Sequence, residues 1–490
     1  MEEQGIMEKG LMLKKPLLQV HNHNDHNVTD EMPQPTGDSS SASSSATPSV
    51  VFSTFVAVCG SFCYGSALAY SSPAESGIME DLGLSLAAYS IFGSNLTIGG
   101  TVGALACGKI AALIGRKGAM WLSGIFSMIG WLTIAYAKGA WWLYIGRLLQ
   151  GFGVGITTYV VPVYIAEITP KDIRGTFSFS NQLMVNCGLA LVYFIGNDIS
   201  WRTLALIGAI PCIVQIIGLF LIPESPRWLV KCGKEKDFEI SLQRLRGKNV
   251  DISQEVDDIR DSIEALEQHS RNTILDLFQR RYAYAIFIGV GLMLLQQAGG
   301  SGAISSYASS IFKEADFSTS IGTSAIAIIV IPMGVIGVLL MDVSGRRPLL
   351  LASCSGMCLC CFLVALSFFL QEHHQLRNLA PVLAFVSIMG YFAAFSVGIA
   401  GIPWIIMSEI FPINVKASAG SLVALVNWSC SWLVTYTFNF MLEWSPAGTF
   451  IIFGSVCGSA VLFTWKLVPE TKGRTLEEIQ ASMVHVVQSN

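Results

Sequence analysis

Charged residues recur in the order base, acid, base, acid in the two halves of this chain. The first set consists of Arg116, Glu167, Arg174, Glu224 and Arg227. The second set consists of Arg346, Arg347, Glu409, Lys416 and Glu470. Acids and arginines that gather at one face can form a network of ion pairs that locks two parts of a protein in one state and releases them in another. The alternative is that these charges only set the topology of the loops.

The elements that must position these charges are long apolar segments. The chain is 52% hydrophobic and only 13% charged, about half the charge content of a soluble domain. Each apolar run is close to the ~20 residues that a helix needs to cross a bilayer, and backbone groups there can bond only within a helix. The sequence therefore predicts an all-α membrane protein with twelve transmembrane helices. The runs cover approximately 49–71, 86–112, 118–137, 141–165, 177–196, 203–222, 283–312, 319–341, 349–370, 380–407, 417–440 and 447–468.

The runs group into two sets of six, which predicts two helix bundles with polar segments before, between and after them. The polar start is of low complexity and is predicted to be a disordered tail, while the middle segment carries apolar residues at helical spacing. Most of the 30 lysines and arginines fall on the side that holds both ends of the chain, so both termini are predicted to be cytoplasmic. The predicted segments are tail 1–48, bundle 49–222, helical linker 223–281, bundle 282–468 and tail 469–490.

Several classes of function are disfavoured by the composition. A formal net charge of −4 gives no reason to expect a nucleic-acid partner. The cysteine-rich run at 354–361 shares its segment with no histidine or acid, so no metal site is predicted there. The apolar segments hold no nucleophile–base pair and no metal cluster, so we expect neither an enzyme nor a cofactor.

The combined motifs resemble the sugar-porter family of the major facilitator superfamily. Within it, the chain is most similar to the plant early-dehydration-responsive monosaccharide transporters, over residues 50–475. The resemblance implies two six-helix bundles that rock around one central sugar site, with the lipid bilayer as the other partner. The motifs are Arg147-Leu148-Leu149-Gln150-Gly151, Pro162-Val163-Tyr164-Ile165-Ala166-Glu167, Pro223-Glu224-Ser225-Pro226-Arg227, Gln296-Gln297 and Pro469-Glu470-Thr471-Lys472-Gly473.

Amides and an indole within the apolar runs are suited to binding a sugar. An amide can both donate and accept toward neighbouring hydroxyls, and an aromatic plane packs on the apolar face of a pyranose ring. The alternative for each amide is a hydrogen bond between helices with no ligand. The positions that match sugar-contacting sites of the family are Gln182, Gln296, Gln297, Trp404 and Asn427.

Two glycine-rich stretches interrupt the apolar runs and are predicted to act as gates. Gly299 and Gly300 follow the glutamine pair after one alanine, and Pro403 ends a second stretch just before the indole. Glycine and proline loosen a spanning helix where it lines a cavity, although close helix packing is the alternative for the glycines. The resemblance implies that Tyr307 is part of the outer gate.

One departure from the family bears on the energy source. Proton-coupled relatives carry an acid in the first span, at the position that Ala67 occupies here, whereas the arginine that pairs with it is retained as Arg147. An arginine does not release its proton, and no acid falls within the apolar runs of the first half. We therefore expect facilitated diffusion of a hexose-type monosaccharide. The alternatives are a proton-coupled symporter or antiporter that uses another group, and a sensor that binds sugar without transporting it.

The N-terminal tail carries a candidate sorting signal. Leu13, Leu17 and Leu18 form a dileucine motif of the kind that sorting adaptors bind, and related plant transporters use a similar motif to reach the vacuole. The tail therefore favours the vacuolar membrane or another endomembrane over the plasma membrane.

Overall fold

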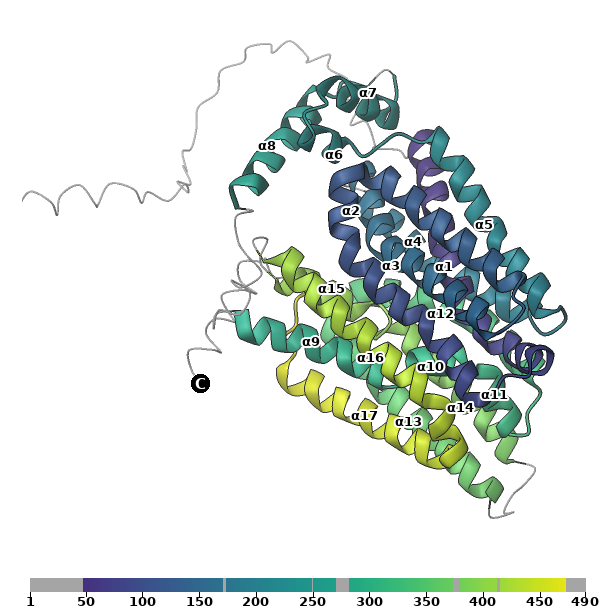
Figure 1. Cartoon of the computed structure of the whole chain (residues 1–490). Coiled ribbons are helices and arrows are strands. Elements are labelled where there is room, and N and C mark those ends of the chain that lie inside the picture. Colours follow the sequence, from purple (N-terminus) through teal and green to yellow (C-terminus); the bar gives the residue numbers. More distant parts are fainter. Residues whose placement is uncertain are drawn as a thin grey trace, which may run out of the picture. The chain divides into compact units, whose positions relative to one another are not determined.

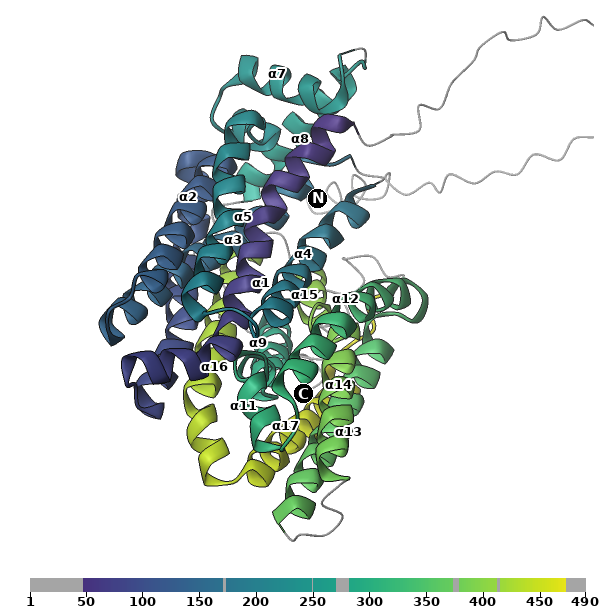
Figure 2. The same ribbon diagram turned by 90° about the vertical axis from the view of Figure 1, so that its right-hand side faces the viewer.

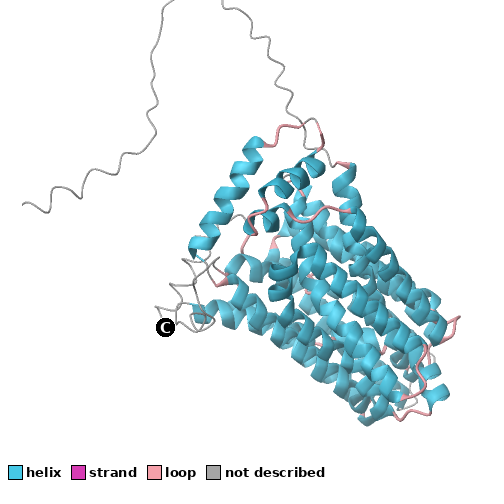
Figure 3. Ribbon diagram, turned by 45° about the horizontal axis from the view of Figure 1, so that its top comes forward, coloured by secondary structure: helices cyan, strands magenta, loops and turns pink. Residues whose placement is uncertain are grey.

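The structure is a computed structural model that describes residues 47–170, 173–248, 250–269, 282–372, 379–411 and 415–472. In these ranges every regular element is a helix (Figure 3). The predicted sorting motif of Leu13, Leu17 and Leu18 lies outside the described residues, as does nearly all of the predicted N-terminal tail.

The first half contains five helices that provide six membrane spans. The longest helix, α2, is interrupted at Gly115, whose φ of 81° and ψ of 175° are not helical. This turn divides α2 into the second and third predicted spans. The helices of this half are α1 (Pro48–Leu82), α2 (Leu86–Ala135), α3 (Ala140–Ile168), α4 (Arg174–Ile195) and α5 (Trp201–Leu221).

Three short helices, α6 (Pro226–Lys231), α7 (Glu235–Arg246) and α8 (Ser253–His269), follow the first half. Phe238 and Leu242 of α7 pack with Val256 and Ile259 of α8 in a small separate core, because their three- and four-residue spacing puts them on one face of each helix. Figure 1 shows α6–α8 together at one end of the long helices, and Figure 2 shows α7 and α8 at that end from another side. We call this end the linker face and the other end the opposite face.

The second half repeats the pattern of six spans, two of which are broken. The first broken span consists of α9 (Ala283–Ala298), α10 (Ser301–Ser306) and α11 (Ala308–Glu314), and the second of α14 (Ala380–Val397) and α15 (Ile402–Ile410). The other spans are α12 (Thr319–Ser344), α13 (Arg346–Glu372), α16 (Lys416–Trp444) and α17 (Pro446–Leu467). Together the halves give the twelve spans that the sequence predicts (Figure 1). By length and composition alone, ten described segments are long and apolar enough to cross a membrane.

Glycines allow α2 and α3 to approach so closely that their backbones touch. A Cβ atom at Gly151 of α3 would lie 2.1 Å from the carbonyl oxygen of Leu96 in α2, which is too short for any real contact. Gly99 of α2 faces the same seam, because a Cβ atom there would lie 2.2 Å from the carbonyl oxygen of Leu148. Small residues at such contacts are typical of helix pairs in membranes, where van der Waals packing holds helices together.

We expect Gly151→Ala to lower the thermal midpoint of the purified protein in detergent, because overpacking at such a contact costs about 1–3 kcal/mol. Gly108→Ala is the matched control, since nothing lies within 4 Å of a Cβ atom at Gly108 on the neighbouring helix α2. It should leave the midpoint unchanged or raise it, because alanine stabilises a helix interior by roughly 0.5–1 kcal/mol relative to glycine. Equal midpoints for both variants would contradict the close packing.

Candidate functional site

Two of the predicted amides meet in the second half. Asn427 of α16 donates from Nδ2 to Oε1 of Gln296 at 3.1 Å. Gln296 of α9 in turn donates from Nε2 to the carbonyl oxygen of Ile399 at 2.6 Å and to that of Ala400 at 3.3 Å. These carbonyls lie in the break between α14 and α15, where no helical partner is available. The two buried amides therefore tie α9 and α16 to the break. The side-chain oxygen Oδ1 of Asn427 can accept a hydrogen bond from a ligand hydroxyl.

The other predicted contact residues lie outside this amide pair and keep accessible surface. Gln297 is half-buried, and its Oε1 lies 3.4 Å from where a Cβ atom at Gly302 would be. Trp404 is 38% exposed in the first turn of α15. Gln182 is exposed on α4 and donates to Asn186 Oδ1 of the same helix at 3.3 Å. These three side chains have the free surface that a ligand would need.

A polar stripe runs along one face of α16. The sequence predicts only its first residue, Asn427, and misses the others. Its four buried members are spaced four residues apart, so they share one face of the helix: they are Asn427, Ser431, Thr435 and Asn439. The hydroxyls of Ser431 and Thr435 lie 3.0 Å and 3.7 Å from a Cβ atom built at Gly302. Gly302 thus packs closely against Gln297 and these hydroxyls, at a point where even a methyl group would be crowded. Four-residue spacing of polar residues in an apolar run is a signal that the sequence contains.

Both glycine-rich stretches break their helices. The first break has Gly300 at a φ of +90°, and a Cβ atom there would lie 2.6 Å from the Phe453 ring, so only glycine suits this position. The carbonyl oxygen of Gly299 accepts a hydrogen bond from the Tyr391 hydroxyl at 3.0 Å. At the second break, Pro403 lies in the first turn of α15, where its missing N–H leaves no hydrogen bond unmade.

Tyr307 is fully buried where the two halves meet. Its ring stacks on Phe438 at a centroid distance of 5.5 Å. Its hydroxyl lies close to Gly93 of α2, because a Cβ atom there would be 2.3 Å away. Two hydrogen bonds also join the halves toward the opposite face. Ser72 pairs with Ser309 at 2.8 Å, and Asn197 donates to Thr323 at 2.8 Å. The halves are thus in contact at this end.

Arg147 of α3 is completely buried and bonds to neutral oxygens. One Nη1 hydrogen bond goes to the carbonyl oxygen of Ala67 at 2.8 Å and another to Gln150 Oε1 at 2.8 Å. Nη2 donates to the Ser71 hydroxyl, and the guanidinium lies 4.6 Å from the centre of the Phe92 ring. At the position where proton-coupled relatives carry an acid, a backbone carbonyl therefore faces the cation. This guanidinium is a fixed charge, because it does not release its proton.

The first charge set forms a compact cluster at the linker face. Arg116 donates from Nε and Nη2 to the two oxygens of Glu167 at 2.9 Å and 2.8 Å. Glu224 accepts hydrogen bonds from the backbone N–H groups of Arg116 and Lys117 at 3.1 Å. These are the first N–H groups of the helix that follows the turn at Gly115, where an anion is favoured by the unpaired donors and the helix dipole.

The second charge set repeats this geometry. The backbone N–H groups of Arg346 and Arg347, at the start of α13, donate to Glu470 at 3.1 Å and 3.0 Å. Nη2 of Arg346 lies 3.2 Å from Glu409 Oε1. Gly345 has a φ of 89° and a ψ of 175°, close to the φ of 81° at its counterpart Gly115. Each of these bonds stays within one half of the chain.

The pKa values of the two capping carboxylates are shifted in opposite directions. Burial raises the pKa of Glu224, although N–H donors from Ser225, Lys117 and Arg116 act to lower it. At Glu470 burial also acts to raise the pKa, but backbone N–H donors outweigh it and the pKa is lowered. The backbone N–H donors therefore outweigh burial only at Glu470, the more exposed of the two carboxyls.

The remaining members of the charge sets are cations. Burial lowers the pKa of Arg174, and the nearby charges of Arg227 and Arg246 lower it further. Within the first set, the charges of Arg174 and Arg227 thus lie close enough to repel each other. Lys416 begins α16, and its side chain lies outside the described residues.

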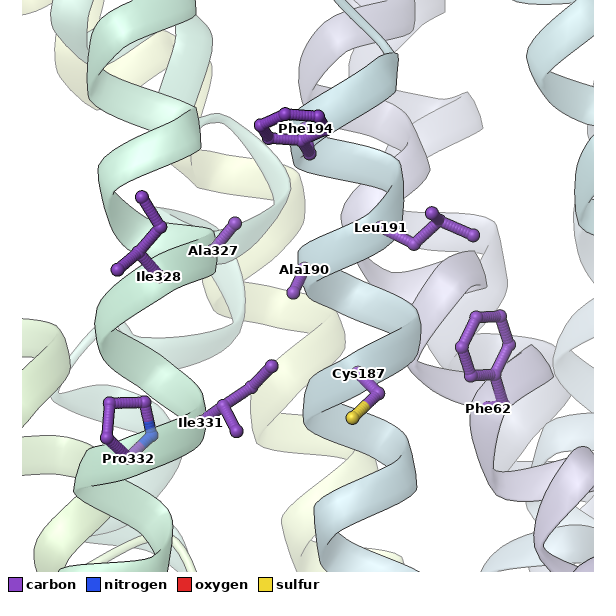
Figure 4. Close-up of a pocket in the computed structure, with 9 residues that line it drawn as sticks. All are labelled: Phe62, Cys187, Ala190, Leu191, Phe194, Ala327, Ile328, Ile331 and Pro332. Carbon is purple, nitrogen blue, oxygen red and sulfur yellow. The ribbon is translucent and has the colours of Figure 1, made fainter.

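An apolar pocket of about 510 Å³ lies where α4 and α12 face each other (Figure 4). Gln182 is not among the residues that line this pocket. It lies five residues before Cys187, which does line it, and therefore about 140° away around the axis of α4. The walls of the pocket offer no amide or hydroxyl side chain, so sugar hydroxyls would lose their partners there. It is not a candidate sugar site. Its lining residues are Phe62, Cys187, Ala190, Leu191, Phe194, Ala327, Ile328, Ile331 and Pro332.

Comparisons with known proteins agree with this geometry. A family model described as "Sugar (and other) transporter" matches residues 39–483. The chain is 52% identical over 480 residues to "Sugar transporter ERD6-like 17" of Arabidopsis thaliana, a match that covers 98% of each protein. It is 54% identical over 439 residues to "Sugar transporter ESL1" of the same plant, covering 90% of this chain and 93% of that one.

Solved structures with the same fold include the xylose transporter XylE from E. coli. Its inward open conformation matches with a TM-score of 0.74 and 25% sequence identity, covering 88% of this chain and 99% of that chain. The proton:xylose symporter XylE bound to 6-bromo-6-deoxy-D-glucose matches with a TM-score of 0.73 and 26% identity, covering 89% and 99%. The prediction of a major facilitator fold is confirmed.

The opposite pKa shifts of the capping carboxylates predict unequal effects on stability. A lowered pKa means that the stabilising contribution of Glu470 is present at neutral pH and is lost as the pH falls through that pKa. The raised pKa of Glu224 means that its contribution is complete in acid and is lost as the pH rises through that pKa. We therefore expect Glu470→Gln to lower the thermal midpoint at pH 7 more than Glu224→Gln does.

The two glutamates are matched controls for each other, because both cap a helix that follows a positive-φ glycine. Thermal unfolding at neutral and at acid pH checks the ranking. The difference between the variants should shrink as the pH falls, and a larger loss for Glu224→Gln at pH 7 would contradict the assignment.

Proposed function

This chain belongs to the sugar transporter family of the major facilitator superfamily, and we propose that it moves a hexose-type monosaccharide by facilitated diffusion. It is a multi-pass membrane protein that transports sugar. It is a transporter rather than an enzyme, in keeping with its relatives. The proposal concerns the mode of transport, the sugar class and the residues that carry them out.

The observation that carries the proposed mode is the environment of Arg147. Its hydrogen bonds go to the Ala67 carbonyl, the Gln150 amide oxygen and the Ser71 hydroxyl. None of these three groups binds and releases a proton near neutral pH. An arginine with such partners stays charged throughout the cycle, so it offers no route by which a proton gradient could drive sugar movement.

Five side chains are proposed to contact the sugar: Gln182, Gln296, Gln297, Trp404 and Asn427. The accessible amide of Gln297 and the indole of Trp404 would provide hydroxyl and ring contacts. The buried pair of Gln296 and Asn427 would shape the floor of the site, because most of its hydrogen-bonding groups already have partners within the protein. This division of roles follows from the burial of each side chain.

The gates and charge sets are proposed to serve the two states of an alternating-access cycle. In this proposal Tyr307, which is buried against Phe438, closes the opposite face, and the breaks at Gly299, Gly300 and Pro403 let the spans bend. The two charge sets lie on the linker face, so closure of that face would bring them together. We propose that they form the lock that holds the outward-open state.

The linker face and both termini are proposed to be cytoplasmic, since most lysines and arginines lie on that side. The dileucine of Leu13, Leu17 and Leu18 supports recognition by a sorting adaptor and residence in the vacuolar membrane or another endomembrane rather than the plasma membrane. Orientation and location are independent of the transport mode.

A proton-coupled mechanism is the second candidate, because the structural neighbour XylE is named a proton:xylose symporter. Purified protein in liposomes separates the two. We expect hexose uptake that only equilibrates the sugar, whether or not a pH gradient is imposed, because Arg147 has no acidic hydrogen-bond partner among the described residues. Radiolabelled sugar inside the liposomes is measured against time. Accumulation above the outside concentration under the gradient would contradict facilitated diffusion.

We expect Gln297→Ala and Trp404→Ala each to raise the half-saturating hexose concentration by about tenfold or more, because a polar group that loses its partner costs about 1–3 kcal/mol. Counterflow of labelled hexose measures this. Trp465→Ala is the matched control, since that indole is 58% exposed on α17. If both site variants transport like the control, the proposed site is wrong.

A further inference from the structure

Glu75 is a buried carboxyl that the sequence prediction overlooked. The predicted first span ended at residue 71, and no acid was expected within the spans of the first half. That expectation was wrong, because the helix α1 continues to Leu82 and Glu75 is only 8% exposed within it. Buried carboxyls in a membrane helix are costly and usually have a functional reason.

The partner of Glu75 comes from the other half of the chain. The Ser310 hydroxyl on α11 donates to Glu75 Oε2. Three residues earlier on α1, the Ser72 hydroxyl lies 2.8 Å from the Ser309 hydroxyl and accepts from the Ser309 backbone N–H at 2.9 Å. We call these four residues, Ser72, Glu75, Ser309 and Ser310, the α1–α11 seam. The seam joins the halves, so it must open when they separate at this end.

We propose that the Glu75 carboxylate takes up a proton from the solution at the opposite face each time the α1–α11 seam closes, so that the pH on that side sets the rate of sugar transport. When the seam is open, water can solvate the carboxylate. When it is closed, one hydroxyl donor replaces that water, which is too little to compensate a buried negative charge. The neutral carboxyl is therefore the form that fits the closed seam.

The charged and titratable groups around Glu75 leave this conclusion in place. Lys313 of α11 is the cation that acts on the carboxyl, but it is exposed, so solvent screens its charge. Tyr89 of α2 and Tyr307 also interact with Glu75, and phenols ionise only near pH 10. Arg147 is occupied by partners in its own half.

The position of Glu75 explains why it would regulate transport without driving it. Ser310 follows Tyr307 by three residues, about 4.5 Å along the chain direction, and α9–α11 run toward the opposite face (Figure 2). Glu75 thus lies on the outer side of the contact between Tyr307 and Phe438. A carboxyl that gains and loses its proton on the same side changes the rate of a cycle but transfers no proton across the membrane. The inference rests on the proposed transport function and adds to facilitated diffusion without altering it.

Sugar counterflow in proteoliposomes, with equal pH on both sides between about pH 5 and pH 8, tests the proposal. We expect the wild-type rate to fall as the pH rises, with a limiting slope of about tenfold per pH unit for one proton. Glu75→Gln should give a rate that is high and independent of pH, because the amide is neutral and can still accept from Ser310. Ser310→Ala removes the donor that stabilises the carboxylate in the closed seam, so the rate should fall further at high pH than in the wild type.

Glu80→Gln is the matched control, because Glu80 lies on the same helix and is exposed; it should keep the wild-type profile. Glu75→Asp keeps an ionisable group and should keep a pH-dependent rate, which decides the matter if Glu75→Gln does not fold. A pH-independent wild-type rate, an unchanged profile in Glu75→Gln or a flat profile in Glu75→Asp would overturn the proposal. A pH gradient that drives accumulation in the wild type but not in Glu75→Gln would instead refute facilitated diffusion and make Glu75 the coupling group.

Discussion

Both halves depend on the same interaction, in which a carboxylate caps the start of a helix that is distant from it in the sequence. Glu224 and Glu470 each follow the last span of their half and accept from the first N–H groups of the third span. The turn between the second and third spans needs glycine, because a Cβ atom at Gly115 would lie 2.4 Å from the Glu224 carboxylate. Each half is thereby closed from its middle to its end, and the arginine after the glycine extends the cluster to the fourth span.

Contacts within a half and contacts between halves differ in strength. Within each half the cluster uses charged groups, whose hydrogen bonds are roughly twice as strong as neutral ones. Between the halves, the contacts at the opposite face include neutral hydroxyls and amides such as Ser72 with Ser309 and Asn197 with Thr323, each worth about 0.5–1.5 kcal/mol net. Charged clusters within each half and neutral polar contacts between the halves are compatible with rocking around a central site.

The features that depend on local pattern could be predicted from the sequence, whereas pairings between distant residues could not. Runs of apolar residues located the spans, and the glycine-rich stretches located both helix breaks. Gln296 and Asn427 are 131 positions apart, and only the packed helices show that each amide satisfies the other. Glu75 was missed for the same reason. Ser72 and Pro73 end the apolar run, but a helix can carry polar residues through the membrane when a partner helix satisfies them, as the hydroxyls of α11 do here.

The two buried ionisable groups near the path between the halves, Arg147 and Glu75, have opposite properties. Arg147 keeps its proton and bonds within its own half, so its interactions need not change when the halves move. Glu75 bonds across the halves, so its surroundings must change with every cycle. A group can sense pH only if its solvation differs between the states of the cycle. Among the described residues, no acid is hydrogen-bonded to this fixed cation, whereas the Glu75 carboxyl lies at a contact that must break when the halves move.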